Sequence, residues 1–320
     1  MIDVFFTVDV EIWCDSWNNI DKEFPSAFKR YIEGPTSRGR YGLPYQIDVL
    51  NQHNLKGVFF IEPLFALRCG QQALDDIVGL VRQGGQEVQL HLHTEWLDES
   101  REPLFEGYQP KRQHLRYFNL AEQTRLIAKG REMLHQAGVR DINAFRAGSF
   151  AFDRNTLSAL AANKIPFDSS YNASMFGSDS GIFPGLRLVE PVEFEGVHEY
   201  PMTVFKDGTS ALRHTQLTAC STEEMQSLLW QALEQRRKSF VILSHGFELL
   251  NQAKDRPDDV VVKRFHKLCA FLDRHRDSFR TCGFQGLTPL SVAAQPEPLQ
   301  SPFHRTGARM LTQLYRKRFG

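Results

Sequence analysis

The chain has 320 residues, of which 42% are hydrophobic and 24% charged, and its formal net charge is zero. This is the composition of an ordinary globular protein with a sizeable core, and the balanced charge gives no support for nucleic-acid binding. No run approaches the ~18 apolar residues of a membrane span, and no export signal precedes the first apolar segment. Five scattered cysteines without a CxxC pair suggest a reducing compartment, so we expect a cytoplasmic protein. They are Cys14, Cys69, Cys220, Cys269 and Cys282.

The first half of the sequence alternates between short apolar runs and amphipathic segments. The apolar runs predict buried strands, and the segments with apolar residues three and four apart predict helices. In chain order we expect a strand at 4–10, a polar and aromatic loop at 14–42, a helix at 44–51, a strand at 58–61, a helix at 74–83, a strand at 87–92, a loop at 98–119 and a helix at 120–136. This βαβα order predicts parallel strands wrapped by helices.

The second half continues this order with one irregular stretch. We expect a strand at 142–145, a helix capped by Asp153 and ending at 162, irregular strands and loops at 171–220, a helix from Ser221 to about 237, a strand at 240–243, a helix at 259–274 and a last strand at 284–287. There is no internal repeat and no low-complexity linker. The sequence therefore favours one domain, 1–295, followed by a basic tail, 296–320.

The tail combines positive charge with apolar residues. From 303 to 320 it has no acid and five cations, which are Arg305, Arg309, Arg316, Lys317 and Arg318. Met310, Leu311, Leu314 and Tyr315 interleave with them. This pattern favours a solvated or core-docked terminal helix, and it is also compatible with a helix that makes peripheral contact with anionic lipid.

Polar residues stand where five of these strands end. Parallel α/β folds gather their functional groups at the carboxyl ends of strands. Each residue alone could be an ordinary cap, turn or strand residue, but five such ends together favour a functional site. The residues are Asp9 and Glu11; His91, His93 and Glu95; Arg146; Asp168; and His245.

The first two groups offer ligands for a metal ion. Two imidazoles with one or two carboxylates suit Zn²⁺ or a similar divalent ion. Glu11 and His91 are the candidate ligands from the two strands, and the third is either His93, at i+2, or Glu95, at i+4. A catalytic ion at such a site lowers the pKa of water toward ~7.

The remaining groups can move protons. Asp9 is placed to act as a base, and Arg146 can orient it through a bidentate pair. His245 can act as an acid, with Asp168 holding its tautomer.

These segments resemble the motifs of the polysaccharide deacetylases (NodB-type, carbohydrate esterase family 4). Thr7-Val8-Asp9-Val10-Glu11 resembles the first motif, and the segment 85–91 resembles the approach to the His-x-x-x-His motif. Phe145-Arg146-Ala147-Gly148 is similar to the Arg-x-Pro motif, Asp168-Ser169-Ser170 to the fourth, and Leu243-Ser244-His245 to the Leu-x-His motif. The matches follow the family order from residue 7 to about 248. The segments around His93 and His245 further resemble a subgroup linked to surface polysaccharide or lipopolysaccharide.

The resemblance implies a distorted, incomplete (β/α) barrel that removes acyl groups from amino sugars with the help of a metal. It implies that Asp9 is the base, Arg146 its partner, His245 the acid and Asp168 the residue that positions the acid.

Three positions depart from the family pattern. Val10 stands where the family has a second aspartate, so the ligand moves to Glu11; Glu95 stands in place of the second histidine, and Gly148 in place of the proline.

The function predicted from the sequence is a zinc-dependent hydrolase that removes an acetyl or formyl group from an amino sugar of a cell-envelope glycan or its precursor, whether free, lipid-linked or nucleotide-linked. Trp13, Trp17 and Trp96 would bind the sugar ring. The alternatives are hydrolysis of another amide, as in allantoinase-like enzymes, and a non-catalytic carbohydrate-binding protein.

Overall fold

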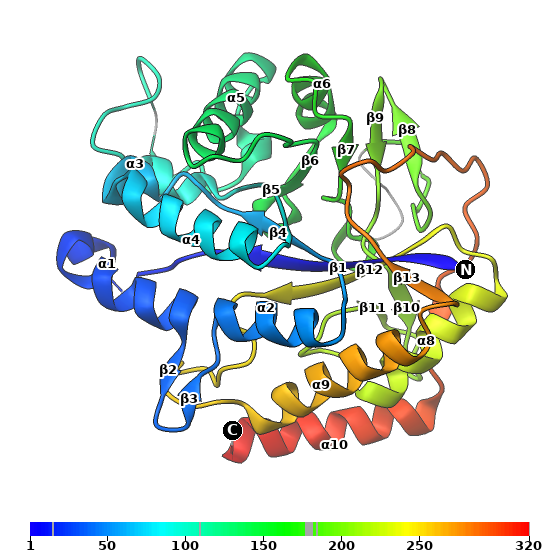
Figure 1. Cartoon of the computed structure of the whole chain (residues 1–320). Helices are drawn as coiled ribbons and strands as arrows, with labels where there is room; N and C mark the ends of the chain where they lie inside the picture. Colours follow the sequence, from blue (N-terminus) through cyan, green and yellow to red (C-terminus); the bar gives the residue numbers. More distant parts are fainter. Residues whose placement is uncertain (15, 109, 177–181, 184, 320) are drawn as a thin grey trace.

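A curled parallel sheet forms the centre of the computed structural model, which describes residues 1–14, 16–108, 110–176, 182, 183 and 185–319 (Figure 1). Only the pairing of β8 with β9 in this sheet is antiparallel. The strand order is β12 (Ser239–His245), β1 (Ile2–Val10), β4 (Gly57–Ile61), β5 (Glu87–Leu92), β6 (Ala144–Ala147), β7 (Phe167–Asp168), β9 (Val197–Glu199) and β8 (Val192–Phe194), and β13 (Phe279–Thr281) also pairs with β1. The sheet is an incomplete barrel, as the sequence predicted.

Helices surround the convex side of this sheet (Figure 1). They are α2 (Leu43–Gln52), α4 (Gln71–Gln83), α5 (Leu120–Gln136), α6 (Arg154–Ala162), α8 (Thr222–Glu234) and α9 (Asp259–Arg274). Several begin at a residue that satisfies their first backbone N–H groups. The Asn119 and Glu122 side chains form a capping box at the start of α5, and Ser221 with Glu224 does the same for α8.

The alternation of side chains along the strands divides the core into two layers and positions the site. Phe5, Phe60 and Val241 belong to a small apolar cluster inside the barrel, whereas Phe6 and Phe59 belong to the larger cluster shared with the helices. Since successive side chains of a strand point to opposite faces, the residues an even number of positions beyond the inner cluster project toward the barrel mouth. The inner face of β1 therefore continues from Phe5 to Asp9 and Glu11.

Smaller elements complete the chain. They are α3 (Ala66–Cys69), α7 (Ala173–Phe176), the paired strands β2 (Pro35–Thr36) and β3 (Gly39–Arg40), and a second sheet in the order β11 (Leu212–His214), β10 (Val204–Lys206) and β14 (Leu299–Gln300). Helix α10 (Phe303–Phe319) follows β14. Among the described residues, no helix combines the length and the apolar character needed to cross a bilayer.

Two predictions about the elements were wrong. The expected loop at 14–42 contains α1 (Ile20–Phe28), which continues into a π-helical turn (Lys29–Glu33). The last strand of the sheet lies at β13 rather than at 284–287. Phe284 instead packs inside the barrel, where its ring stacks on Phe5 with centroids 4.8 Å apart.

Candidate metal centre

Four strand ends meet at the barrel mouth and bring six of the predicted site residues together. Strands β12, β1, β4, β5 and β6 are consecutive in the sheet, and β1 and β12 are in register at Asp9 and His245. His91 of β5 is likewise in register with Arg146 of β6. Glu11 and His93 follow two residues after Asp9 and His91 and lie on the same faces as these residues. All but the partly exposed His245 are buried.

One oxygen of Glu11 is the point on which three imidazoles converge. Glu11 Oε1 lies 3.3 Å from His91 Nε2, 3.2 Å from His93 Nε2 and 3.9 Å from His245 Nε2. The other carboxylate oxygen, Oε2, accepts a hydrogen bond of 2.7 Å from the Trp13 indole N–H. The Trp13 bond thus fixes the carboxylate with Oε1 facing the histidines.

The hydrogen bond on the far side of His91 determines its tautomer. Nδ1 lies 2.8 Å from the backbone oxygen of Arg146. A carbonyl oxygen can only accept, so Nδ1 carries the proton and neutral His91 turns the lone pair of Nε2 toward Glu11 Oε1. Two acceptors then face each other across 3.3 Å. A cation between them, either a proton or a metal ion, removes this repulsion.

His93 stands between two carboxylates. Its Nδ1 lies 3.3 Å from Glu95 Oε2, opposite the contact of its Nε2 with Glu11. Burial alone would lower the pKa of His93, but the charges and hydrogen bonds of Glu11 and Glu95 outweigh it and raise that pKa well above its usual value. Burial would raise the pKa of Glu11, and the surrounding histidines hold it well below its usual value instead.

The donor set fits a divalent metal ion. One ligand atom each from Glu11, His91 and His93 lie within 4.8 Å of one another, and so do atoms of Asp9, Glu11 and His245. In the first set, each histidine directs Nε2 inward and holds Nδ1 against an acceptor, which is the usual outer shell of a metal-binding histidine. Two imidazoles and a carboxylate leave a fourth position open, as in catalytic zinc sites.

The geometry bears on the choice between His93 and Glu95 as the third ligand. Glu95 reaches the far nitrogen of His93 rather than the space between Glu11 and His91. We therefore take His93 as the candidate ligand and Glu95 as the acceptor that orients it.

Gly148 makes room for this histidine. A Cβ atom at Gly148 would lie 2.7 Å from His93 Nδ1 and 2.6 Å from the backbone oxygen of Leu92. Any larger residue would push the His93 ring out of place. The departure from the proline of the family motif and the presence of a histidine at position 93 thus fit together physically.

Arg146 forms a buried ion pair with Asp9, the candidate base. Its Nη1 donates to Asp9 Oδ1 at 2.7 Å and to Thr7 Oγ1 at 2.9 Å, and its Nη2 donates to Ser169 Oγ at 3.1 Å. The guanidinium is fully buried over the Phe60 ring. The expected bidentate pair is corrected to one bond on Asp9, because the hydroxyls of Thr7 and Ser169 and the backbone oxygen of Ser169 accept from the other N–H groups.

The predicted pairing of Asp168 with His245 is wrong. Asp168 is fully buried, where its Oδ1 accepts from Ser170 Oγ at 2.6 Å. Burial raises the pKa of both Asp168 and Glu199, and the charge of Asp168 raises the pKa of Glu199 further, well above its usual value. Asp168 Oδ2 and Glu199 Oε2 are buried without another hydrogen-bond partner, so a proton between the two carboxyl groups would satisfy both.

Glu248 occupies the position that was expected for Asp168. Its Oε1 lies 2.9 Å from His245 Nδ1, and it also accepts a hydrogen bond from Gln216. Burial lowers the pKa of His245, but Glu248, with smaller effects of Glu11 and Asp9, raises it to about 9. The sequence signal was the i, i+3 spacing of the two residues in the turn after β12.

A second carboxylate missed from the sequence is Glu62, directly after β4. It is buried, and its oxygens accept from the backbone N–H groups of Leu64 and Phe65. Burial raises the pKa of Glu62 to about 8 despite the opposing charge of His93. Its position directly after an apolar strand is a sequence signal that could have identified Glu62.

The three tryptophans differ in what they can contact. Trp96 is 1% exposed, so its predicted contact with a sugar is wrong; its ring packs edge-on against Trp17, with centroids 4.9 Å apart. Trp13 is half-buried between Glu11 and His93, and its ring centroid lies 4.8 Å from that of His93. Trp13 and Trp17 remain candidates for contact with a ligand at the mouth.

No protein-family model and no curated protein matches the sequence. Among solved structures, the chain is similar to a protein from Mycobacterium smegmatis described as a polysaccharide deacetylase, with a TM-score of 0.53 and 18% identity over 92% of this chain and 94% of that one. A family 4 carbohydrate esterase from Streptomyces lividans gives a TM-score of 0.43 and 12% identity over 92% and 97% of the two chains. The first likeness confirms the fold expected from the sequence.

Proposed function

Because the chain has the fold of the polysaccharide deacetylases, we propose that it is a metal-dependent hydrolase that removes an N-acetyl or N-formyl group from an amino sugar of a cell-envelope glycan or its precursor. The observation that carries this proposal is the convergence of His91, His93 and His245 on one oxygen of Glu11. A buried Asp9–Arg146 pair lies beside this point.

The proposed metal is a divalent ion such as Zn²⁺ held by Glu11, His91 and His93. When bound, such an ion polarises an acyl carbonyl and makes water more acidic. Trp13 would fix the carboxylate ligand, and the Arg146 carbonyl and Glu95 would fix the two imidazoles.

The chain's own residues would carry the protons. Asp9, oriented by Arg146, would take a proton as the water oxygen adds to the acyl carbon. His245 would give a proton from Nε2 to the sugar nitrogen as the carbon–nitrogen bond breaks, which releases acetate or formate and the free amine. Glu248 keeps the other proton on Nδ1, and the raised pKa of His245, about 9, keeps the imidazole protonated at neutral pH.

The test is release of acetate or formate from N-acetylglucosamine oligosaccharides and from an N-formyl amino sugar by zinc-loaded protein. Asp9→Asn should lower kcat by roughly 10²–10⁴-fold, whereas Asp21→Asn, which changes an exposed carboxylate, should leave it unchanged. Glu248→Gln should lower kcat more than KM, since it acts through His245.

Equal turnover by wild type and Asp9→Asn would contradict the assignment of the base. Ring opening of a cyclic amide without acyl release would favour the allantoinase-like alternative. Binding of the sugars without turnover, despite stoichiometric zinc, would favour a carbohydrate-binding protein.

A further inference from the structure

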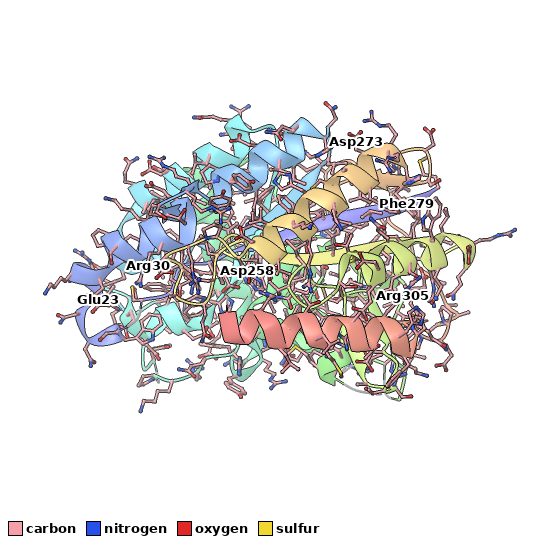
Figure 2. All side chains as sticks on the ribbon, turned by 90° about the horizontal axis from the view of Figure 1, so that it is seen from below. Glu23, Arg30, Asp258, Asp273, Phe279 and Arg305 are labelled. Carbon is pink, nitrogen blue, oxygen red and sulfur yellow. The ribbon has the colours of Figure 1, made fainter. Side chains whose placement is uncertain are left out.

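Helix α10 packs on the body of the protein with its polar side and turns its apolar side outward. Figure 2 shows the helix lying along one face of the molecule. Thr306 and Arg309 on its inner side are fully buried, and Gln313 and Arg316 continue the same side, half-buried. The outer side carries large apolar residues with exposed fractions of 71% for Phe303, 43% for Met310, 70% for Leu311 and 64% for Leu314. A terminal helix ordinarily buries its apolar stripe, so this one is reversed.

Specific polar bonds hold α10 in this orientation. Arg309 donates to Asp207 at 2.7 Å and to Glu224 at 3.3 Å, all three side chains being buried. Arg316 donates to Asp258 at 2.8 Å. A rotation that buried the apolar stripe would leave these carboxylates without their partner, at a high desolvation cost.

The start of the helix fits its support closely. The Thr306 hydroxyl accepts from the backbone N–H of Gly208 at 2.8 Å, and a Cβ atom at Gly208 would lie 2.3 Å from the Cα of Phe303. The outward direction of the stripe is therefore built into the fold.

A groove connects this helix to the catalytic candidate His245. It has a volume of about 660 Å³, and its lining includes His245 and Glu248 together with Gln313 and Arg316 of α10. A substrate in this groove would touch both the proposed acid and the helix with the apolar stripe.

The charge of α10 indicates what could cover the stripe. The helix has no Asp or Glu, and Arg305, Lys317 and Arg318 add to the two arginines that bond the body. Arg305 is half-exposed, and the side chains of Tyr315, Lys317 and Arg318 lie outside the described part of the structure. In a two-fold dimer through this face, two acid-free helices would meet and repel. A negatively charged lipid surface complements them.

We propose that α10 lies flat on a bilayer containing anionic lipid, with Phe303, Met310, Leu311 and Leu314 among the acyl chains and Arg305 at the headgroups. Residues 303–319 form about five turns, so the helix spans ~25 Å of surface. The contact holds the groove beside the bilayer, and a sugar substrate carried on a lipid could enter it there. That last step rests on the proposed function, whereas the membrane contact does not.

The test is sedimentation of the full chain with phosphatidylcholine vesicles, with and without phosphatidylglycerol. The wild type should bind the anionic vesicles more tightly, by about fivefold for each cation near the surface. The double change Leu311→Ser with Leu314→Ser should lower the partition coefficient by about tenfold per leucine. Met175→Ser, at a residue 60% exposed on α7, is the matched control and should bind as the wild type does. Thermal unfolding verifies that each variant is folded.

Equal binding by the wild type and the double variant would overturn the proposal, as would absence of wild-type binding to anionic vesicles. A third result would also overturn the proposal: a wild type that dimerises with increasing concentration and does not bind vesicles, together with a double variant that stays monomeric. That result would assign the apolar stripe to contact with a second copy of the chain. The assay contains neither substrate nor metal, so a failure of the proposed hydrolysis leaves its outcome unaffected.

Discussion

Two buried charge clusters in this protein are built in opposite ways. At the α10 anchor, Arg309 donates to two carboxylates, Asp207 and Glu224, so donors face acceptors. At the barrel mouth, Glu11 Oε1 meets the Nε2 atoms of three histidines at 3.2 to 3.9 Å, and the proton of His91 is held on its other nitrogen. In the first cluster each carboxylate meets a cation, although Arg309 Nε has no hydrogen-bond partner. In the second, the lone pair of His91 faces the Glu11 carboxylate, an arrangement that suits an added cation.

The comparison teaches how a structural charge cluster differs from a binding site. Burial and short distances are common to both, and a search for buried ionisable groups would find both. The direction of the hydrogen bonds separates them, because a cluster whose acceptors face each other is stable only with an added proton or metal ion.

The largest expected effect comes from removing the cation of the α10 anchor. Arg309→Met leaves Asp207 and Glu224 buried without their cation, and we expect the free energy of unfolding to fall by about 3–5 kcal/mol, measured by urea denaturation. Arg38→Met is the control, since Arg38 forms an ion pair with Asp259 in which both side chains are more than half exposed. A loss no larger than that of the control would contradict the structural role of the anchor.

The next largest effect is expected from a substitution at the barrel mouth that leaves all three candidate metal ligands in the sequence. In Gly148→Ala the new methyl group would displace the His93 ring, and we expect zinc affinity to fall by about 10- to 100-fold. Calorimetric titration of metal-free protein measures it. Gly79→Ala is the control, because a Cβ at that helical position lies 3.9 Å or more from its neighbours. Unchanged affinity in Gly148→Ala would argue against His93 as a ligand.

The smallest expected effect concerns Asp168 and Glu199, whose buried carboxyl groups we expect to share a proton. Since burial raises the pKa of Glu199 well above its usual 4.5, the folded chain retains a proton that the unfolded chain loses. The free energy of unfolding therefore falls as the pH rises above about 4.5, until the pH passes the folded pKa. Glu199→Gln cannot ionise and keeps a donor for Asp168.

We expect Glu199→Gln to be more stable than the wild type by about 1 kcal/mol at slightly alkaline pH, with a smaller difference near about pH 5. Denaturation at the two pH values measures this. A difference independent of pH would contradict the shared proton.

Local signals made most of the fold predictable. The helix at 120–136 was predicted with its observed bounds, and the structure shows that Asn119 and Glu122 cap its start. Helix α1 was missed because Pro25 interrupts a polar segment, although Ile20, Phe24 and Ala27 are buried at helical spacing. There, packing against the core decides the structure and local propensity does not.

The site was predictable where it depends on strand periodicity. Asp9, Glu11, His91 and His93 lie at alternate positions, so one strand direction brings all four to the mouth. The partners of these residues depend on tertiary contacts that spacing does not reveal. Glu248 is a different case: it follows His245 by three residues, and it was missed because its role had been assigned to Asp168.

The most direct test of the central claim is a crystal structure of the zinc-loaded protein with anomalous scattering at the zinc edge. We expect one zinc ion at about 2.0–2.2 Å from Glu11 Oε1, His91 Nε2 and His93 Nε2, with Glu95 on the far nitrogen of His93. Zinc bound by the Glu95 carboxylate, or no zinc between Glu11 and His91 at stoichiometric metal, would contradict it.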